Sequence, residues 1–303
     1  MVLRGPDELA FADFTDPVAG EGEEVVDVLA AGLNPVDLMR MSEGEVPSVP
    51  GNEGVGLLRG ERVYFERTLA PFGSFAQRAK VSAGLPIPLA AELGNGAALT
   101  IGIAGLAGWL SLEWAAKLRP GESVLVLGAS GAVGHVSVQA ARLLGAGRIV
   151  AAARDRSALE RLRELGADAV VSLEGDYAGA LHRAARAGFD VVIDPLFGAP
   201  LVAALGATAL GARVVSLGAS AGATATISRS VLSGRQLLTY GNRMTPAAVK
   251  RTAYERMSRH VLADELTAAE FELIELERYA EAFDRQAAYP HRKLVLVPPP
   301  LPR

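Results

Sequence analysis

The chain has 303 residues, half of them hydrophobic, and a formal net charge of −4 at pH 7. This composition supplies enough apolar surface for two ordinary domains, and no block of like charges indicates nucleic-acid or polybasic membrane binding. The sequence contains no cysteine, which excludes disulfides, thiolate nucleophiles and cysteine-ligated zinc. No apolar signal segment is visible near Met1, so we expect a cytoplasmic protein.

The first part of the chain, residues 1–95, is predicted to be a β-rich domain. A partly alternating segment at 24–31 is followed by Gly32-Leu-Asn-Pro, and further glycines and prolines punctuate the sequence at short intervals. Strand-like segments occupy 62–65 and 74–81. Short strands with frequent turn signals are typical of such a domain.

An uncharged segment, Leu93–Leu112, is long enough to cross a bilayer. It contains several glycines and polar residues, and no cluster of positive charge flanks it. We therefore predict a buried, closely packed helix rather than a membrane span, and we expect Trp109 and Trp114 to fill the core or a dimer interface.

Strand patterns alternate with helical patterns beyond this segment, which predicts a doubly wound parallel sheet. One of the helices opens with a candidate capping box formed by Ser157 and Glu160. The predicted strands are 122–127, 148–153, 169–172, 189–194 and 213–218, and the predicted helices are 135–144, 157–165, 177–187 and one near 200–210.

The last part of the chain is helical and charged from about Thr245, and it closes with a strand at 293–297. We expect this strand to rejoin the sheet of the first domain. The predicted architecture is therefore α/β, with a β-rich domain formed by 1–95 and 243–303 and a parallel-sheet domain formed by 96–242.

A strand that runs into a glycine-rich bend, Val124–Gly134, carries the strongest functional signal. Gly128 can form the tight turn, Gly131 lets the backbone approach a pyrophosphate, and Gly134 lets the next helix lie close to the strand. Glycines in an Ala/Gly-rich chain can also serve packing alone, but the flanking strands and helix favour dinucleotide binding at a helix N-terminus. The contacts are expected from Ser130, Gly131, Ala132 and Val133.

The residues after the second strand bear on the choice between NAD and NADP. NAD sites usually place an acid at the end of this strand, whereas here the strand ends in alanine and Arg154 follows. Arg154, with Arg156 as a second candidate, is expected to pair with the 2′-phosphate of NADPH. Asp155 is a rival as a ribose-binding acid, although we favour its role as the cap of the next helix.

Several motifs together resemble the medium-chain dehydrogenase/reductase superfamily, and the likeness extends over almost the whole chain. The resemblance implies a GroES-like catalytic domain and a Rossmann cofactor domain. It also implies a homodimer joined through the cofactor-domain sheets, with Gln236–Tyr240 as the candidate edge strand. The motifs include Gly32-Leu-Asn-Pro-Val-Asp37, Pro50-Gly-Asn-Glu53-Gly-Val-Gly56, Gly73-Ser-Phe-Ala76, Gly131-Ala-Val-Gly134, Leu165-Gly-Ala-Asp168 and Phe189-Asp-Val-Val-Ile-Asp-Pro195.

The zinc-binding branch of this superfamily has cysteine and histidine ligands, including a histidine in a Pro-Gly-His-Glu motif. Here Asn52 occupies that position, cysteine is absent and the four histidines are scattered. The sequence therefore resembles the zinc-independent branch of quinone oxidoreductases, ζ-crystallin-like proteins and related enoyl reductases, and we expect no metal site.

The resemblance implies further roles for individual residues. Asn34 and Lys293 are expected near the cofactor, and Ala153 falls at the position of the NAD-selecting acid, which supports NADPH. Many relatives have a tyrosine shortly after the Asn-Pro-x-Asp motif, but this chain does not, so no catalytic residue is assigned. The segment between Gly56 and Glu61 is also short, which predicts a trimmed hairpin. Further cofactor contacts are implied at Leu217, Gly218, Ala219, Tyr240, Gly241 and Asn242, and candidates for the substrate cleft are Asn34, Arg40 and Tyr64.

The function expected from these observations is hydride transfer from NADPH to a small molecule, namely a quinone or similar conjugated carbonyl acceptor, without zinc. The anion formed from a quinone is delocalised and can be protonated by solvent, so the missing tyrosine is tolerable. One alternative is an enoyl reductase acting on an α,β-unsaturated carbonyl or thioester, which needs a proton donor such as Ser42, Arg40 or Tyr64. The other is a non-catalytic NADPH-binding sensor.

Overall fold

The computed structural model describes residues 1–5, 8–41, 46–288 and 291–301. The chain divides into two compact units, residues 1–103 with 254–303 and residues 104–253. The first is called the mixed-sheet unit and the second the parallel-sheet unit. The limits predicted from the sequence, after residues 95 and 242, lie several residues before these.

The parallel-sheet unit contains a six-stranded sheet of order β10-β9-β8-β11-β12-β13, in which every pairing is parallel. The path through this sheet starts at β8, winds outward to β10, returns to β11 beside β8 and winds outward to β13. This confirms the predicted doubly wound sheet and puts the topological switch point between β8 and β11. The strands are β8 Ser123–Leu127, β9 Arg148–Ala153, β10 Ala169–Ser172, β11 Phe189–Asp194, β12 Thr208–Ser216 and β13 Gln236–Thr239; the helices are α4 Ala132–Leu143, α5 Arg156–Glu164, α6 Tyr177–Ala185, α7 Gly198–Gly206 and α8 Arg229–Leu232.

The inner strands of this sheet are hydrophobic on both faces because helices cover both faces of a doubly wound sheet. Residues 124–127 of β8 and 191–193 of β11 are completely buried. The helices are amphipathic instead: in α5, Leu159 and Leu162 are buried while Glu160 is exposed. Each buried leucine contributes about 1.5–3 kcal/mol to the core.

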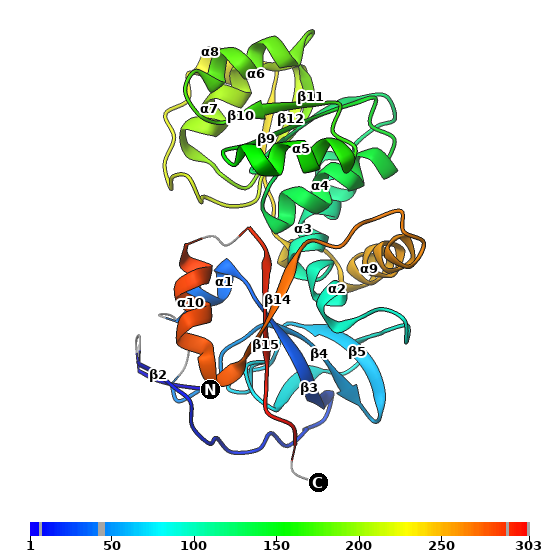
Figure 1. Cartoon of the computed structure of the whole chain (residues 1–303), viewed down its shortest axis with the longest axis vertical. Coiled ribbons are helices and arrows are strands. Elements are labelled where there is room, and N and C mark those ends of the chain that lie inside the picture. Colours follow the sequence, from blue (N-terminus) through cyan, green and yellow to red (C-terminus); the bar gives the residue numbers. More distant parts are fainter. Residues whose placement is uncertain (6–7, 42–45, 289–290, 302–303) are drawn as a thin grey trace. The chain divides into compact units, whose positions relative to one another are not determined.

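The mixed-sheet unit contains a seven-stranded sheet of order β14-β15-β3-β4-β5-β7, with β6 also paired to β3. The red strand β15, Lys293–Val297, rejoins this sheet, as predicted, and lies antiparallel to the blue strand β3, Glu23–Leu33 (Figure 1). Around this sheet lie β1 Val2–Gly5, β2 Glu8–Ala10, α1 Pro35–Met41, η3 Leu276–Arg278 and α10 Tyr279–Ala287, while the other strands are β4 Glu53–Leu58, β5 Glu61–Glu66, β6 Arg78–Ser82, β7 Ile87–Pro88 and β14 Phe271–Glu275.

Two details of this unit follow from local backbone chemistry. The β4–β5 hairpin is as short as predicted, because Arg59 and Gly60 form a two-residue turn with φ of 52° and 87°, which suits the twist of a hairpin. The strand predicted at 74–81 begins only at Arg78, since the N–H groups of Ser74 and Phe75 are donated to loop carbonyls at Gly51 and Pro50.

The uncharged segment Leu93–Leu112 is not the single helix that was predicted. It forms α2, Asn95–Thr100, and α3, Ile103–Leu110, and continues as the π-helix η1, Ser111–Ala116. The break falls at Gly102, where a Cβ atom would lie 2.5 Å from Oε2 of Glu53. The expected core position is confirmed for Trp109, at 1% exposure, whereas Trp114 is 44% exposed and lies outside the core. Among the described residues, no helix has the length and apolar character needed to cross a membrane. The remaining elements are η2 Asn242–Met244 and α9 Ala247–Leu262.

The close contact between α4 and β8 depends on the absence of a side chain at Gly134. A Cβ atom there would lie 2.5 Å from Ala129 Cα and from Gly128 O. We predict that Gly134→Ala displaces α4 and lowers the free energy of unfolding by about 1–3 kcal/mol in urea denaturation. Gly206→Ala, at the end of α7, is the control because no atom lies within 4 Å of its added Cβ. Equal losses in the two variants would contradict the prediction.

Candidate functional site

The glycine-rich bend joins β8 to α4 at the carboxyl edge of the parallel sheet. Gly128 has φ of 58°, and the Gly131 N–H is donated back to Gly128 O at 3.0 Å, which closes the turn. Gly131 is the N-cap of α4 and, as a glycine, has no side chain that could cap this end. The N–H groups of Ala132 and Val133, in the first turn, have no acceptor within the helix. The bend therefore presents backbone donors and the positive end of a helix dipole, which suits a phosphate.

The end of β9 separates the roles of Arg154 and Asp155. The Asp155 carboxylate accepts the N–H of Ser157 at 2.8 Å and that of Ala158 at 3.3 Å, so Asp155 is the N-cap of α5. The predicted capping box of Ser157 and Glu160 is therefore wrong, because the helix begins one residue earlier, at Arg156. Arg154 is exposed and forms no hydrogen bond or ion pair with the described part of the chain.

Other predicted cofactor residues lie at the same edge of the sheet. Leu217 follows β12, and its N–H is donated to Asp194 O at 2.8 Å; Gly218 and Ala219 are exposed after it. Tyr240 follows β13, where its hydroxyl is 2.7 Å from Thr245 Oγ1, and Gly241 and Asn242 come next. Arg156 lies in the first turn of α5. The fold thus gathers all of these segments at the carboxyl ends of neighbouring strands.

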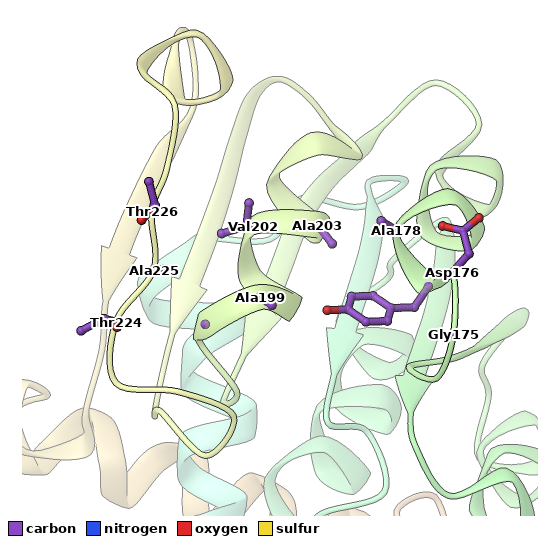
Figure 2. A pocket seen from close by; sticks show the side chains of 11 residues that line it. Gly175, Asp176, Ala178, Ala199, Val202, Ala203, Thr224, Ala225 and Thr226 are labelled. Atoms are coloured by element: carbon purple, nitrogen blue, oxygen red, sulfur yellow. The ribbon is translucent and has the colours of Figure 1, made fainter.

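An open groove of about 590 Å³ lies in the same unit. Figure 2 shows its walls: Ala199, Val202 and Ala203 of α7, the segment Thr224–Thr226, and the start of α6 near Asp176. The lining is mostly apolar, with a few hydroxyl groups. Because α6 and α7 follow β10 and β11, the groove also lies toward the carboxyl edge of the parallel sheet.

The mixed-sheet unit holds a cluster of polar side chains around Glu53, which is completely buried. Its Oε1 accepts hydrogen bonds from Asn34 Nδ2, at 2.8 Å, and from Lys293 Nζ. Its Oε2 accepts the Tyr64 hydroxyl at 3.0 Å and the Ile103 N–H at 2.8 Å. Four donors therefore satisfy this carboxylate, as a buried charge requires.

Asn34 is committed to the same cluster. It is 3% exposed; its Oδ1 accepts Lys293 Nζ at 2.6 Å, and its Nδ2 is also donated to Gly32 O at 3.2 Å. Tyr64 is 1% exposed, and its ring stacks on Tyr254 with the ring centroids 4.4 Å apart. Burial raises the pKa of the Tyr64 hydroxyl well above its usual value.

Of the predicted residues in this unit, the structure brings together Asn34, Tyr64 and Lys293. Arg40 lies in α1, one turn beyond Asp37, and Ser42 falls outside the described residues. Glu53 is the centre of the cluster but was not predicted as a site residue. The motif Pro50–Gly56 could have indicated that Glu53 is the centre of a cluster. A carboxylate that lies beside small residues in a buried strand needs buried hydrogen-bond partners.

Comparison with known proteins shows where this fold and site belong. A family model described as "Zinc-binding dehydrogenase" matches residues 132–259. The quinone oxidoreductase from Thermus thermophilus, whose structure was solved also in complex with NADPH, is 30% identical, and the match covers 98% of each chain with a TM-score of 0.84.

Two curated relatives are similar over shorter parts of their own length. Acrylyl-CoA reductase AcuI from Ruegeria pomeroyi is 34% identical over 66% of this chain. A phenolphthiocerol/phthiocerol polyketide synthase from Mycobacterium tuberculosis is 29% identical over 93% of this chain. The match spans 62% of the length of the former and 14% of the length of the latter.

The chain belongs to the medium-chain dehydrogenase/reductase superfamily. Within it, the chain is similar to quinone oxidoreductases, as the sequence motifs implied. Among the described residues, no group of three or more His, Asp or Glu side chains is placed to hold a metal ion.

The carboxyl group of Asp37 is expected to make the stability of the protein depend on pH. Burial raises the pKa of this carboxyl to about 7, against the opposing hydrogen bond from the Asn34 N–H at 2.8 Å. Because the native state then holds a proton that the unfolded state loses above about pH 4, stability should fall as the pH rises from about 4 to 7.

We predict that Asp37→Asn removes this dependence. The amide oxygen can still accept the Asn34 N–H, so the variant should gain on the order of 3 kcal/mol relative to the wild type between about pH 4 and about pH 7.5. Urea denaturation at each pH measures the difference. The exposed Asp13→Asn variant controls for the loss of one negative charge. Parallel pH profiles for the wild type and Asp37→Asn would refute the assignment.

Proposed function

We propose that this chain binds NADPH and transfers a hydride from it to a quinone or similar conjugated carbonyl acceptor. The observation that carries the proposal is the bend at Gly128–Gly134, where the first N–H groups of α4 lie at the edge of a doubly wound sheet. The related quinone oxidoreductase from Thermus thermophilus, solved with NADPH, supports the same cofactor.

The residues present fit this cofactor without a metal. The first turn of α4 would hold the pyrophosphate, and Arg154 would pair with the 2′-phosphate. Asp155 is occupied as a helix cap, so its carboxylate is turned to the Ser157 and Ala158 amides rather than to a ribose. When bound, NADPH supplies the hydride, and the protein contributes binding, orientation and exclusion of water.

The buried cluster supports a positioning role for Asn34, Tyr64 and Lys293. The amide of Asn34 already bonds to Glu53 and Lys293, and the Tyr64 hydroxyl bonds to Glu53. We infer that these side chains fix the β3–α1 loop. A quinone suits such a site, because its delocalised anion can take a proton from solvent.

An enoyl reductase is the second candidate, and the likeness to acrylyl-CoA reductase AcuI favours it. Addition of hydride to an enoyl group requires a proton at the neighbouring carbon. Tyr64 is a poor donor, because burial raises the pKa of its hydroxyl and that hydroxyl already donates its hydrogen bond to Glu53. A sensor that binds NADPH without turnover is the third candidate.

We also propose a homodimer. The edge strand β13 pairs only with β12 among the described strands, and its Leu237 and Leu238 are partly exposed. A second copy that paired along this edge would cover them.

Stopped-flow oxidation of NADPH distinguishes the three candidates. We expect rapid loss of NADPH absorbance with naphthoquinones and slow loss with enoyl thioesters. Faster turnover of an enoyl thioester would favour the enoyl reductase. Tight NADPH binding without turnover of any acceptor would favour the sensor.

The role of Arg154 has a separate test. We predict that Arg154→Ala weakens NADPH binding by about 1–3 kcal/mol and leaves NADH binding nearly unchanged, because only NADPH carries the 2′-phosphate. Calorimetric titration with each nucleotide measures both constants. Arg163→Ala is the matched control, since Arg163 lies in the last turn of α5 and pairs with Glu160. An unchanged preference for NADPH in Arg154→Ala would show that another group reads the phosphate.

A further inference from the structure

The chain makes a strained turn, Pro195–Gly198, between the end of β11 and α7. Phe197 has φ of 58° and ψ of −160°, a backbone region that is essentially open to glycine alone. Gly198 follows with φ of 60°. A bulky residue remains in such a conformation only where the surroundings determine it, and such residues gather at functional sites.

The side chain of Asp194 holds the peptide plane on the N-terminal side of Phe197. Asp194 is the last residue of β11 and is completely buried. Its Oδ1 accepts the N–H of Leu196 at 3.0 Å and the N–H of Phe197 at 2.9 Å. Two successive N–H groups that point at one oxygen fix the peptide planes on both sides of Leu196. The turn can leave this arrangement only by depriving a buried carboxylate of these two backbone donors.

The turn lies directly against the glycine-rich bend. A Cβ atom on Gly128 would be 3.0 Å from Leu196 Cδ2 and 3.2 Å from Pro195 Cγ. The positions of Pro195 and Leu196 therefore limit where the bend can lie.

The same turn holds the segment after β12. Pro195 O accepts the Ser220 hydroxyl at 3.2 Å, and Leu196 O accepts the Ala221 N–H at 2.8 Å. On its other side, Gly198 and Ala199 line the groove of Figure 2. The turn is thus the structural link between the two segments to which dinucleotide contacts are assigned, the bend at Gly128–Gly134 and the residues from Leu217 to Ala219.

We propose that Asp194 is a positioning residue for the dinucleotide. It acts by holding Phe197 at a positive φ, so that the two segments keep the spacing that the dinucleotide needs. The inference rests on the proposed function, because it names a residue that supports NADPH binding. The side chain of Phe197 is the reason why Asp194 is needed. Glycine at this position would adopt the same turn without help, so the need for Asp194 exists only while residue 197 has a side chain.

The test is a double-mutant cycle in which the dissociation constant of NADPH is measured for the wild type, Asp194→Ala, Phe197→Gly and the double variant. Asp194→Ala should raise the dissociation constant about tenfold or more, because the strained turn loses its support. The double variant should return to within about threefold of the wild type. Asp194→Asn retains an oxygen acceptor for both N–H groups and should also stay within about threefold.

Asp190→Ala is the matched control. Asp190 lies at the opposite end of β11, and its Oδ2 accepts the N–H of Ser123 at 2.8 Å and the Ser123 hydroxyl at 2.7 Å. Its loss should lower the melting temperature without changing the dissociation constant of NADPH. If Asp194→Ala does not fold, Asp194→Leu takes its place in the cycle, because leucine fills the space without an oxygen acceptor.

Two results would overturn the inference. One is a folded Asp194→Ala variant with unchanged affinity for NADPH, and the other is a loss of affinity that Phe197→Gly does not relieve. Either result leaves the proposed function standing as long as the wild type binds NADPH. Absence of NADPH binding by the wild type would instead refute the proposed function itself.

Discussion

The approach of α4 to the end of β8 is the contact on which the proposed dinucleotide site depends. Only a residue without a side chain fits at Gly134, where Ala129 and Gly128 O leave no room for a Cβ atom. The contact sets the first turn of α4 beside the sheet edge, so that the helix dipole and the unsatisfied N–H groups point to one place. The roles proposed for two other features depend on this position of the first turn of α4. They are Arg154, after β9, and the turn that follows Asp194, after β11.

The mixed-sheet unit solves a different physical problem, the burial of charge. Glu53 and Lys293 form an ion pair that is almost wholly inaccessible to water, and their remaining hydrogen-bonding capacity is used by Asn34, Tyr64 and a backbone amide. Removing one partner from such a network lowers the free energy of unfolding by far more than the intact ion pair contributes to it. The cluster ties β15 to β3 and β4, and in this way the last strand of the chain fixes the loop that carries Asn34.

The sequence predicts most of the parallel sheet correctly, because strands buried on both faces appear as uninterrupted hydrophobic runs between turn residues. β9, β10 and β11 begin and end where the pattern indicates. The break between α2 and α3 was missed because it depends on Glu53, which is 50 residues away from Ile103 in the chain. The strained conformation of Phe197 was equally hidden, since a phenylalanine adopts it only beside the buried Asp194. The capping error at α5 arose because Asp155 and Ser157, two residues apart, are both good N-caps.

Hydrogen–deuterium exchange of the wild-type chain, with and without NADPH, tests the central claim most directly. If the bend between β8 and α4 holds the pyrophosphate, NADPH should slow the exchange of the amides at 130–134 more than that of any other segment. Nicotinamide mononucleotide, which lacks the adenosine half and the pyrophosphate, should protect them much less. Unchanged exchange at 130–134 at a saturating concentration of NADPH would contradict the account.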